Sequence, residues 1–127
     1  MLRVIHFEIC ADNPERAAKF YEDAFGWKVR KWEGPVDYWL TVTGDPSELG
    51  INGAIKHRGD STQPVICGIH VPSADEYIQR VLAAGGSVVT PKIEIRGVGF
   101  SACCRDSEGN MFQLFEGFVP GSSRQRS

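Results

Sequence analysis

The sequence predicts an α+β fold of two tandem βαβββ modules that are related by a pseudo-twofold axis. Each half of the chain has a first strand, one short amphipathic helix and three further strand-like segments. A shift of 60 residues superposes the two halves without a gap, so that helix starts, helix ends and the strands that follow them coincide. Because one such module is too small to bury its own sheet face, the two are expected to pair into a single domain.

The first module is expected at about residues 2–57. Its helix is predicted over 13–25, since Asn13 is suited to cap the free N–H groups and Pro14 fits the first helical position. Gly26 follows as a typical helix stop. Strands are expected at 2–10, 27–32, 38–43 and 49–56. One face of the first strand carries Val4, His6, Glu8 and Cys10. A polar linker is expected to join this module to the second.

The second module is expected at about residues 64–117. Its helix is predicted over 73–84, with a capping box that starts at Ser73 and a stop at the glycine pair 85–86. Strands are expected at 65–71, 87–90, 99–104 and 110–116, with a hairpin turn at 106–110. The remaining residues, 118–127, are rich in glycine, serine and charge, and are expected to form a flexible tail.

Composition excludes several classes of protein. The 127 residues carry a formal net charge of −2, which does not favour binding to nucleic acid. No apolar run approaches the ~20 residues that a membrane-spanning helix needs. Glu8 interrupts the apolar N-terminal stretch, so a secretory signal is not expected and the protein is predicted to be cytoplasmic. The four cysteines form no Cys-x-x-Cys pair and are expected to be free thiols.

Motifs at both ends of the chain suggest a family. The N-terminal part carries His6, Asp12, Phe20-Tyr21 and Phe25-Gly26-Trp27. The C-terminal part carries Asp106-Ser107-Glu108-Gly109-Asn110, followed by a strand that ends at Glu116. In these motifs residues 2–117 resemble the vicinal oxygen chelate superfamily, which includes glyoxalases, bleomycin-resistance proteins and extradiol dioxygenases. The resemblance implies a glyoxalase-like fold of paired βαβββ modules.

The resemblance also implies where a metal would bind. In metal-using relatives, four strands supply ligands to one cation in a U-shaped cavity, and the motifs carry the first and last of these positions onto His6 and Gln113. The 60-residue shift gives Ile66 and Gly53 as the other two. Neither has a side chain that binds metal, and Gln113 cannot act as a base. We therefore expect no cofactor, with a divalent metal as the alternative.

Other polar and aromatic side chains are candidates for the same cavity. Glu8 shares a strand face with His6, and His70 shares one with Ile66. The predicted substrate pocket is thus formed by His6, Glu8, Gly53, Ile66, His70 and Gln113. Five aromatic residues are expected either to line this pocket or to form the core and a dimer interface: Trp27, Trp32, Tyr38, Trp39 and Phe100. Cys103 and Cys104 point to opposite faces of their strand, so at most one of them reaches the cavity.

Three functions agree with this pattern. The first is binding of a small organic molecule between the modules, without a complete metal site. The alternative is a metal-dependent lyase, isomerase or dioxygenase with a shifted metal site, for which His6, Glu8 and His70 would be available. The third is a structural or regulatory dimer with a vestigial pocket. Fold alone does not choose among them. A homodimer is expected in each case, without nucleic-acid or membrane partners.

Overall fold

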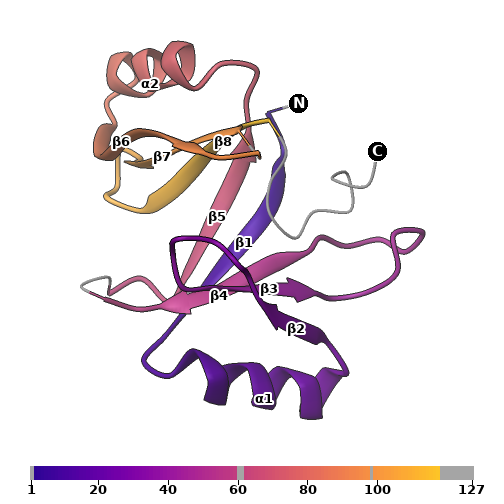
Figure 1. Cartoon of the computed structure of the whole chain (residues 1–127). Helices are drawn as coiled ribbons and strands as arrows, with labels where there is room; N and C mark the ends of the chain where they lie inside the picture. Colours follow the sequence, from indigo (N-terminus) through magenta and orange to yellow (C-terminus); the bar gives the residue numbers. More distant parts are fainter. Residues whose placement is uncertain (1, 60–61, 98, 118–127) are drawn as a thin grey trace.

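A computed structural model describes residues 2–59, 62–97 and 99–117 (Figure 1). The first module contains β1 (Val4–Ala11), α1 (Pro14–Phe25), β2 (Lys28–Lys31), β3 (Tyr38–Val42) and β4 (Gly53–His57). The second contains β5 (Val65–His70), α2 (Ala74–Ala83), β6 (Ser87–Ile95), β7 (Gly99–Arg105) and β8 (Met111–Gly117). The predicted α+β class and its two βαβββ modules are thus confirmed. The expected tail at 118–127 lies outside the described residues, among which no helix is long and apolar enough to cross a membrane.

The described strands form one sheet in the order β2-β3-β4-β1-β5-β8-β7-β6. Within each module the first strand runs parallel to the last, β1 beside β4 and β5 beside β8. The modules meet where β1 pairs antiparallel with β5. Exchanging one module for the other leaves this strand order unchanged, as the pseudo-twofold relationship requires. Figure 1 shows α1 and α2 at opposite ends of the molecule, each beside the strands of its own module.

Both helices begin and end as the sequence predicts. Asn13 caps α1 by accepting a hydrogen bond of 3.0 Å from the Arg16 N–H. Gly26 ends that helix in the left-handed region, with φ of 75°, where glycine has no steric penalty. Ser73 caps α2 by accepting a bond of 3.2 Å from the Glu76 N–H. These local signals fix where each chain segment leaves its helix and enters the sheet.

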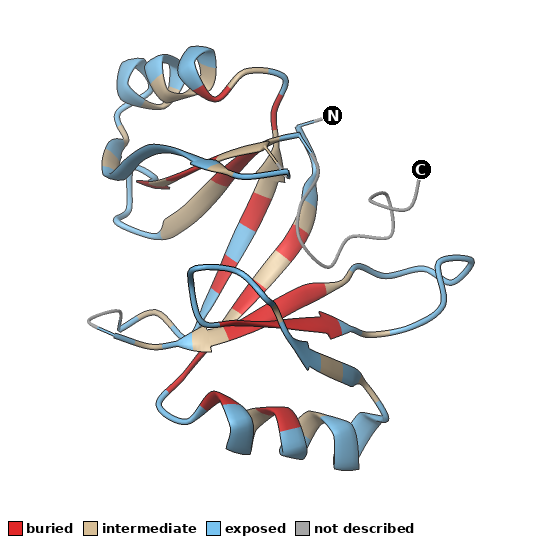
Figure 2. Ribbon diagram, in the orientation of Figure 1, coloured by how far each residue is buried: buried red, intermediate tan, exposed pale blue. Residues whose placement is uncertain are grey.

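Each helix covers one face of its own half-sheet and buries a separate core. Under α1 this core contains Ala11, Ala18, Trp39 and Ile55. Under α2 it contains Val71, Cys104 and Leu114, with partly buried side chains of the helix packed against them. The buried residues in Figure 2 accordingly concentrate in the central strands and on the inner sides of the helices. Because the helices occupy only one face of the sheet, the opposite face is available to line a cavity.

Two strands differ from their predicted bounds. β6 continues to Ile95, well past the predicted end at residue 90. Pro91 lies within it, which is tolerated because β6 is an edge strand and its pairing with β7 shifts register between Thr90 and Ile93. β4 begins at Gly53, later than predicted, since the preceding residues form a loop in which Asn52 accepts a hydrogen bond of 3.0 Å from the Thr43 N–H.

Candidate functional site

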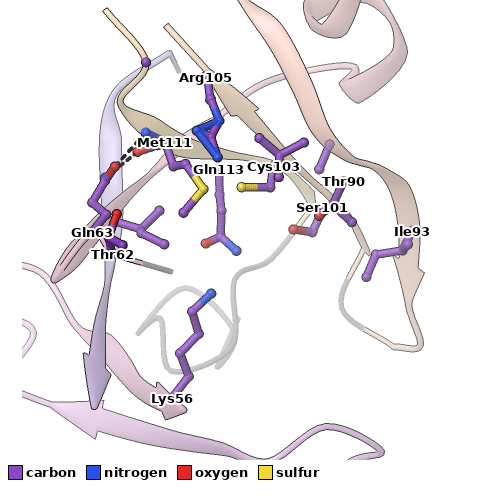
Figure 3. A pocket seen from close by; sticks show the side chains of 14 residues that line it. Lys56, Thr62, Gln63, Thr90, Ile93, Ser101, Cys103, Arg105, Met111 and Gln113 are labelled. Carbon is purple, nitrogen blue, oxygen red and sulfur yellow. Dashed lines mark hydrogen bonds between the residues drawn. The ribbon is translucent and has the colours of Figure 1, made fainter. Parts of the chain in front are cut away.

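The face of the sheet that the helices leave uncovered lines two adjoining chambers. The first, called the polar chamber here, has a volume of about 400 Å³, and the second, the apolar chamber, one of about 510 Å³. The polar chamber is lined by residues that include Lys56, Gln63, Ile66, Thr90, Cys103, Arg105, Met111 and Gln113 (Figure 3). The apolar chamber is lined by residues that include Glu8, Trp32, Val36, Tyr38, Ile95, Arg96 and Phe115. Lys56, Ile93, Ser101 and Gln113 line both, so the chambers form one cavity.

A buried hydrogen-bond network forms one wall of this cavity. The Tyr38 hydroxyl donates a hydrogen bond of 2.5 Å to Glu8 Oε2, and the same hydroxyl oxygen lies 2.7 Å from His6 Nε2. On the other side of the carboxylate, Lys56 Nζ lies 3.0 Å from Glu8 Oε1. His6 and Glu8 are almost completely buried, whereas the Lys56 side chain is 29% exposed. The network therefore presents a cation to the cavity and keeps its carboxylate behind it.

Strand register brings these side chains together. In the antiparallel pair β3–β4, Tyr38 lies directly opposite Lys56. In the parallel pair β1–β4, Glu8 lies opposite Ala54, so Lys56 is two residues further on and projects from the same face. His6 precedes Glu8 by two residues and shares that face. Four residues that are far apart in sequence thus become neighbours because three adjacent strands align.

The hydrogen-bond pattern determines where the protons lie. Tyr38 has one proton and donates it to Glu8, so it can only accept from His6, whose Nε2 must carry a hydrogen. The other ring nitrogen of His6, Nδ1, is buried and has no hydrogen-bond partner among the described residues. The ring packs edge-on against Phe115, with centroids 5.2 Å apart. His6 is therefore held in one orientation behind the cavity wall.

Electrostatics fixes the charges of this network. Burial alone would raise the pKa of Glu8, but His6, the Lys56 ammonium and the Tyr38 hydroxyl together lower it to about 2. Burial, and then the charge of Glu8, raise the pKa of Tyr38 well above its usual range. Burial lowers the pKa of Lys56, but the Glu8 carboxylate raises it more, so that it ends above its usual value. At neutral pH the three groups are an anion, a neutral phenol and a cation.

Two further polar side chains face the cavity from the second module. Gln113 on β8 has a buried Oε1 that lacks a hydrogen-bond partner in the described part of the chain. Cys103 on β7 is opposite Gln113 in the β7–β8 pair and lines the polar chamber. Burial raises the pKa of its thiol more than Lys56 lowers it, so the thiol is not activated. Cys104 belongs to the core under α2, so only one of the two adjacent cysteines reaches the cavity.

The structure separates the predicted pocket residues into three groups. Glu8, Ile66 and Gln113 line the cavity. His6 lies behind the wall, and His70, at the end of β5, lies outside the described lining of either chamber.

Gly53 lies on the opposite face of the sheet, where an added Cβ would lie 2.5 Å from the Phe7 carbonyl oxygen. Strand pairing places Ala54 in the row that Gln113 occupies in the second module, because the repeat shift is 60 residues for β1 and β5 but 59 for β4 and β8. The position derived from the uniform shift therefore belongs one residue further along the chain.

The residues at the implied metal site do not fit a divalent cation. Ile66 and Ala54 occupy two of the four strand positions and offer no donor atom. The Nε2 atom of His6 is already engaged with Tyr38, and the Lys56 ammonium places a positive charge 3.0 Å from the neighbouring carboxylate. Within the described residues, no group of three or more His, Cys, Asp or Glu side chains is arranged to hold a metal ion. The pattern of ligands is therefore replaced rather than shifted.

Sequence reasoning missed the role of Lys56 and Arg105, and it considered Tyr38 only as an aromatic side chain. The signal for Lys56 was alternation along β4, since Ala54 and Lys56 share a face. The uniform 60-residue shift placed Gly53 in the cavity and so assigned the wrong face of this strand. Arg105 follows Cys103 by two residues and could have been found by the same rule.

Comparisons with known proteins agree with this architecture. A family model described as the Glyoxalase/Bleomycin resistance protein/Dioxygenase superfamily matches residues 3–114. Streptomyces coelicolor methylmalonyl-CoA epimerase in complex with 2-nitronate-propionyl-CoA is 15% identical, with a TM-score of 0.69 over 94% of this chain and 99% of the epimerase chain. A hypothetical protein from Bacillus halodurans C-125 is 14% identical, with a TM-score of 0.68 over 92% and 95% of the two chains. The methylmalonyl-CoA epimerase from Mycobacterium tuberculosis is 14% identical, with a TM-score of 0.64 over 92% and 88%. No curated protein sequence matches the chain significantly.

Proposed function

This chain belongs to the Glyoxalase/Bleomycin resistance protein/Dioxygenase superfamily, and from this premise we propose that it binds a small organic molecule in the cavity between its modules, without a metal ion. The cavity is large enough for such a ligand, with adjoining chambers of about 400 and 510 Å³. Its lining combines an apolar region with a few converging polar groups, as small-molecule sites usually do.

The observation that carries this proposal is the ion pair between Lys56 and Glu8. Lys56 Nζ lies 3.0 Å from Glu8 Oε1, on the same strand face as the first predicted metal ligand, His6. A second cation at this place would be repelled by the ammonium group and would have to compete with it for the carboxylate. The protein thus carries its own positive charge in the region where metal-using relatives hold a cation.

The charge states of the network favour binding over proton transfer. A general acid or base works best when its pKa lies near the working pH. Glu8, with a pKa of about 2, is a weak base, while Tyr38 and Lys56 hold their protons more tightly than usual. These three groups therefore act as fixed hydrogen-bond donors, acceptors and charges.

A metal-dependent lyase, isomerase or dioxygenase remains the competing proposal. The observation that favours it is the buried Nδ1 of His6, which has no partner among the described residues and retains a free lone pair. Solved structures of this fold include methylmalonyl-CoA epimerases, one of them in complex with methylmalonyl-CoA and NH4+. At 15% identity this likeness supports the fold and does not transfer the activity.

Metal content distinguishes the two proposals. We expect the purified protein to contain far less than one equivalent of zinc, nickel, iron or manganese, measured by inductively coupled plasma mass spectrometry. We also expect EDTA to leave its melting temperature unchanged. A metal at a hundred times its Kd would add about 2.7 kcal/mol, which is a shift of several degrees for a domain of this size. A stoichiometric metal whose removal lowers the melting temperature by that amount would contradict the metal-free proposal.

We also propose that the protein forms a homodimer. Several large apolar side chains are exposed in the single chain, among them Phe20 and Phe25 at 58% and 64%. Exposed aromatic side chains are enriched at protein–protein interfaces. Sedimentation velocity at micromolar concentration should give the mass of two chains, and a monomer at every concentration tested would refute this part of the proposal.

A further inference from the structure

Charge is distributed unevenly between the two chambers. The described lining of the polar chamber includes the cations Lys56 and Arg105 and no carboxylate. Figure 3 shows the two side chains entering this chamber from opposite sides, with Gln113 between them. Among the described residues, no carboxylate lies within ion-pair distance of Arg105. The guanidinium group is thus available to a ligand that enters the polar chamber.

Lys56 also has capacity for a ligand. Its ammonium group has three protons, and Glu8 Oε1 at 3.0 Å takes one of them. The side chain lines both chambers and is 29% exposed, so the remaining protons are accessible from the cavity. Hydroxyl groups of Thr90 and Ser101 line the same chamber and can add hydrogen bonds to an oxyanion.

The second chamber has the opposite character. Its apolar surface is supplied by Trp32, Pro35, Val36, Ile93, Ile95 and Phe115. Its described charged lining includes three carboxylates, those of Glu8, Glu33 and Glu94, beside Lys56 and Arg96. An anion would be disfavoured near these carboxylates, whereas an apolar group would be desolvated by the surrounding side chains. A ligand with both kinds of group therefore has one favourable orientation.

We propose that the ligand of this cavity is an amphipathic organic oxyanion, bound with its charged head between Lys56 and Arg105 and its apolar body in the chamber lined by Trp32 and Phe115. This inference rests on the proposed function, because it names the class of molecule that the cavity binds. Carboxylates and phosphate esters share the required chemistry, since both present oxygen acceptors to an arginine fork and an ammonium group.

Three probes with the same tail separate the contributions of head and body. We would measure binding of octanoate, octyl phosphate and 1-octanol by isothermal titration calorimetry at low ionic strength. At least one of the two anions should bind about tenfold more tightly than 1-octanol, because hydrogen bonds to charged groups contribute more than neutral ones. Raising the salt concentration should weaken the anion and leave the alcohol unchanged. The tighter of the two anions identifies the preferred head.

A matched pair of variants locates the head. Arg105→Gln should weaken the tighter anion about tenfold and leave 1-octanol unchanged, whereas Arg96→Gln in the apolar chamber should change neither by more than about twofold. Arg105→Lys should restore part of the anion affinity. Arg105 and Arg96 are both exposed, so unchanged melting temperatures would show that each variant folds.

The outcomes separate this inference from the proposed function. If 1-octanol binds as tightly as both anions, or if the two arginine variants lose equal affinity, the cavity binds organic molecules but does not select an oxyanion, and the inference is wrong. If none of the three probes binds, the inference and the proposal of a binding cavity both fail.

Discussion

Lys56 Nζ lies 3.0 Å from Glu8 Oε1, and the two residues come from adjacent parallel strands of the first module. Their side chains are 29% and 3% exposed, so the carboxylate is enclosed while the ammonium group reaches the cavity. An enclosed carboxylate is stable only when it is paired and hydrogen-bonded. Glu8 meets this condition through Lys56 and through the Tyr38 hydroxyl at 2.5 Å.

Replacing Lys56 should destabilise the fold. Lys56→Met leaves Glu8 enclosed without its cation, and we expect a loss of about 2 kcal/mol in the free energy of unfolding, less than for a fully buried pair because the ammonium group is partly exposed. Urea unfolding followed by circular dichroism measures this change. The control is Lys19→Met, which removes an exposed pair with Asp23 and should cost less than about 1 kcal/mol. Equal losses in the two variants would show that the Lys56 pair is no stronger than a surface contact.

Stability should fall in acid because of Glu8. Its pKa is lowered from 4.5 to about 2, so the folded state holds this carboxylate ionised where the unfolded state would protonate it. The corresponding stabilisation, on the order of 3 kcal/mol, is complete above pH 4.5 and is lost as the pH falls toward 2. Urea midpoints between pH 2 and 7 measure the slope. Asp106, whose pKa is lowered by hydrogen bonds from the backbone of Asn110 and Glu108, contributes in the same direction. The slope should therefore become shallower, but not vanish, in Glu8→Gln. An unchanged slope in that variant would contradict the assignment.

Removing the Tyr38 hydroxyl should break the link between the two buried groups. Tyr38→Phe leaves Glu8 Oε2 without its donor and His6 Nε2 without its acceptor, and we expect a loss of about 1–3 kcal/mol. Tyr77→Phe is the matched control, since no side-chain hydrogen bond of its hydroxyl is seen with the described residues, and it should be nearly neutral. The same urea experiment compares them. If Tyr38→Phe is as well tolerated as Tyr77→Phe, the network does not contribute to stability.

The sequence was sufficient to predict the fold because the signals that determine it are local. Asn13 and Ser73 start the helices, and Gly26 ends the first of them in the left-handed region, as expected. The repeat was visible because both modules need the same caps and stops. Pro91 made β6 look shorter than it is, since only the sheet order shows that this strand lies at an edge where proline is tolerated.

The site was less predictable because it depends on register between distant strands. A shift of one residue exchanges the two faces of a strand, and the repeat loses one residue between β1 and β4 relative to β5 and β8. Gly53 was therefore placed where Ala54 lies. The same slip hid Lys56, whose importance appears only when β4 is aligned with β1, so that its ammonium group meets Glu8.

The position of Gly53 can be tested directly. Gly53→Ala would place a Cβ 2.5 Å from the backbone oxygen of Phe7, which cannot move without disturbing the β1–β4 pair. We expect a loss of about 1–3 kcal/mol and unchanged affinity for an organic probe. The control is Gly44→Ala, where the nearest atom would be the flexible end of Glu48 at 3.1 Å. If Gly53→Ala is as stable as the control, or if it selectively reduces probe binding, this glycine faces the cavity after all.

The last prediction concerns the metal. If Lys56 occupies the place of a cation, restoring ligands should not be sufficient for metal binding while the ammonium group remains. The triple variant Ala54→Glu, Ile66→His and Gln113→Glu supplies side chains of the ligand types that bind divalent metals. We expect it to bind Ni²⁺ or Zn²⁺ at least about tenfold more weakly than the quadruple variant that also contains Lys56→Met, because the nearby positive charge opposes the incoming cation.

Isothermal titration calorimetry with each metal compares the two variants, with the wild-type chain and the single variant Lys56→Met as controls. Neither control should bind, since Ala54 and Ile66 still lack donor atoms in both. Circular dichroism and melting temperature establish that the variants fold, which matters because two of the substituted positions are fully or almost fully buried. Equal affinity in the folded triple and quadruple variants would show that Lys56 does not exclude a metal, and that the missing ligands alone account for a metal-free site.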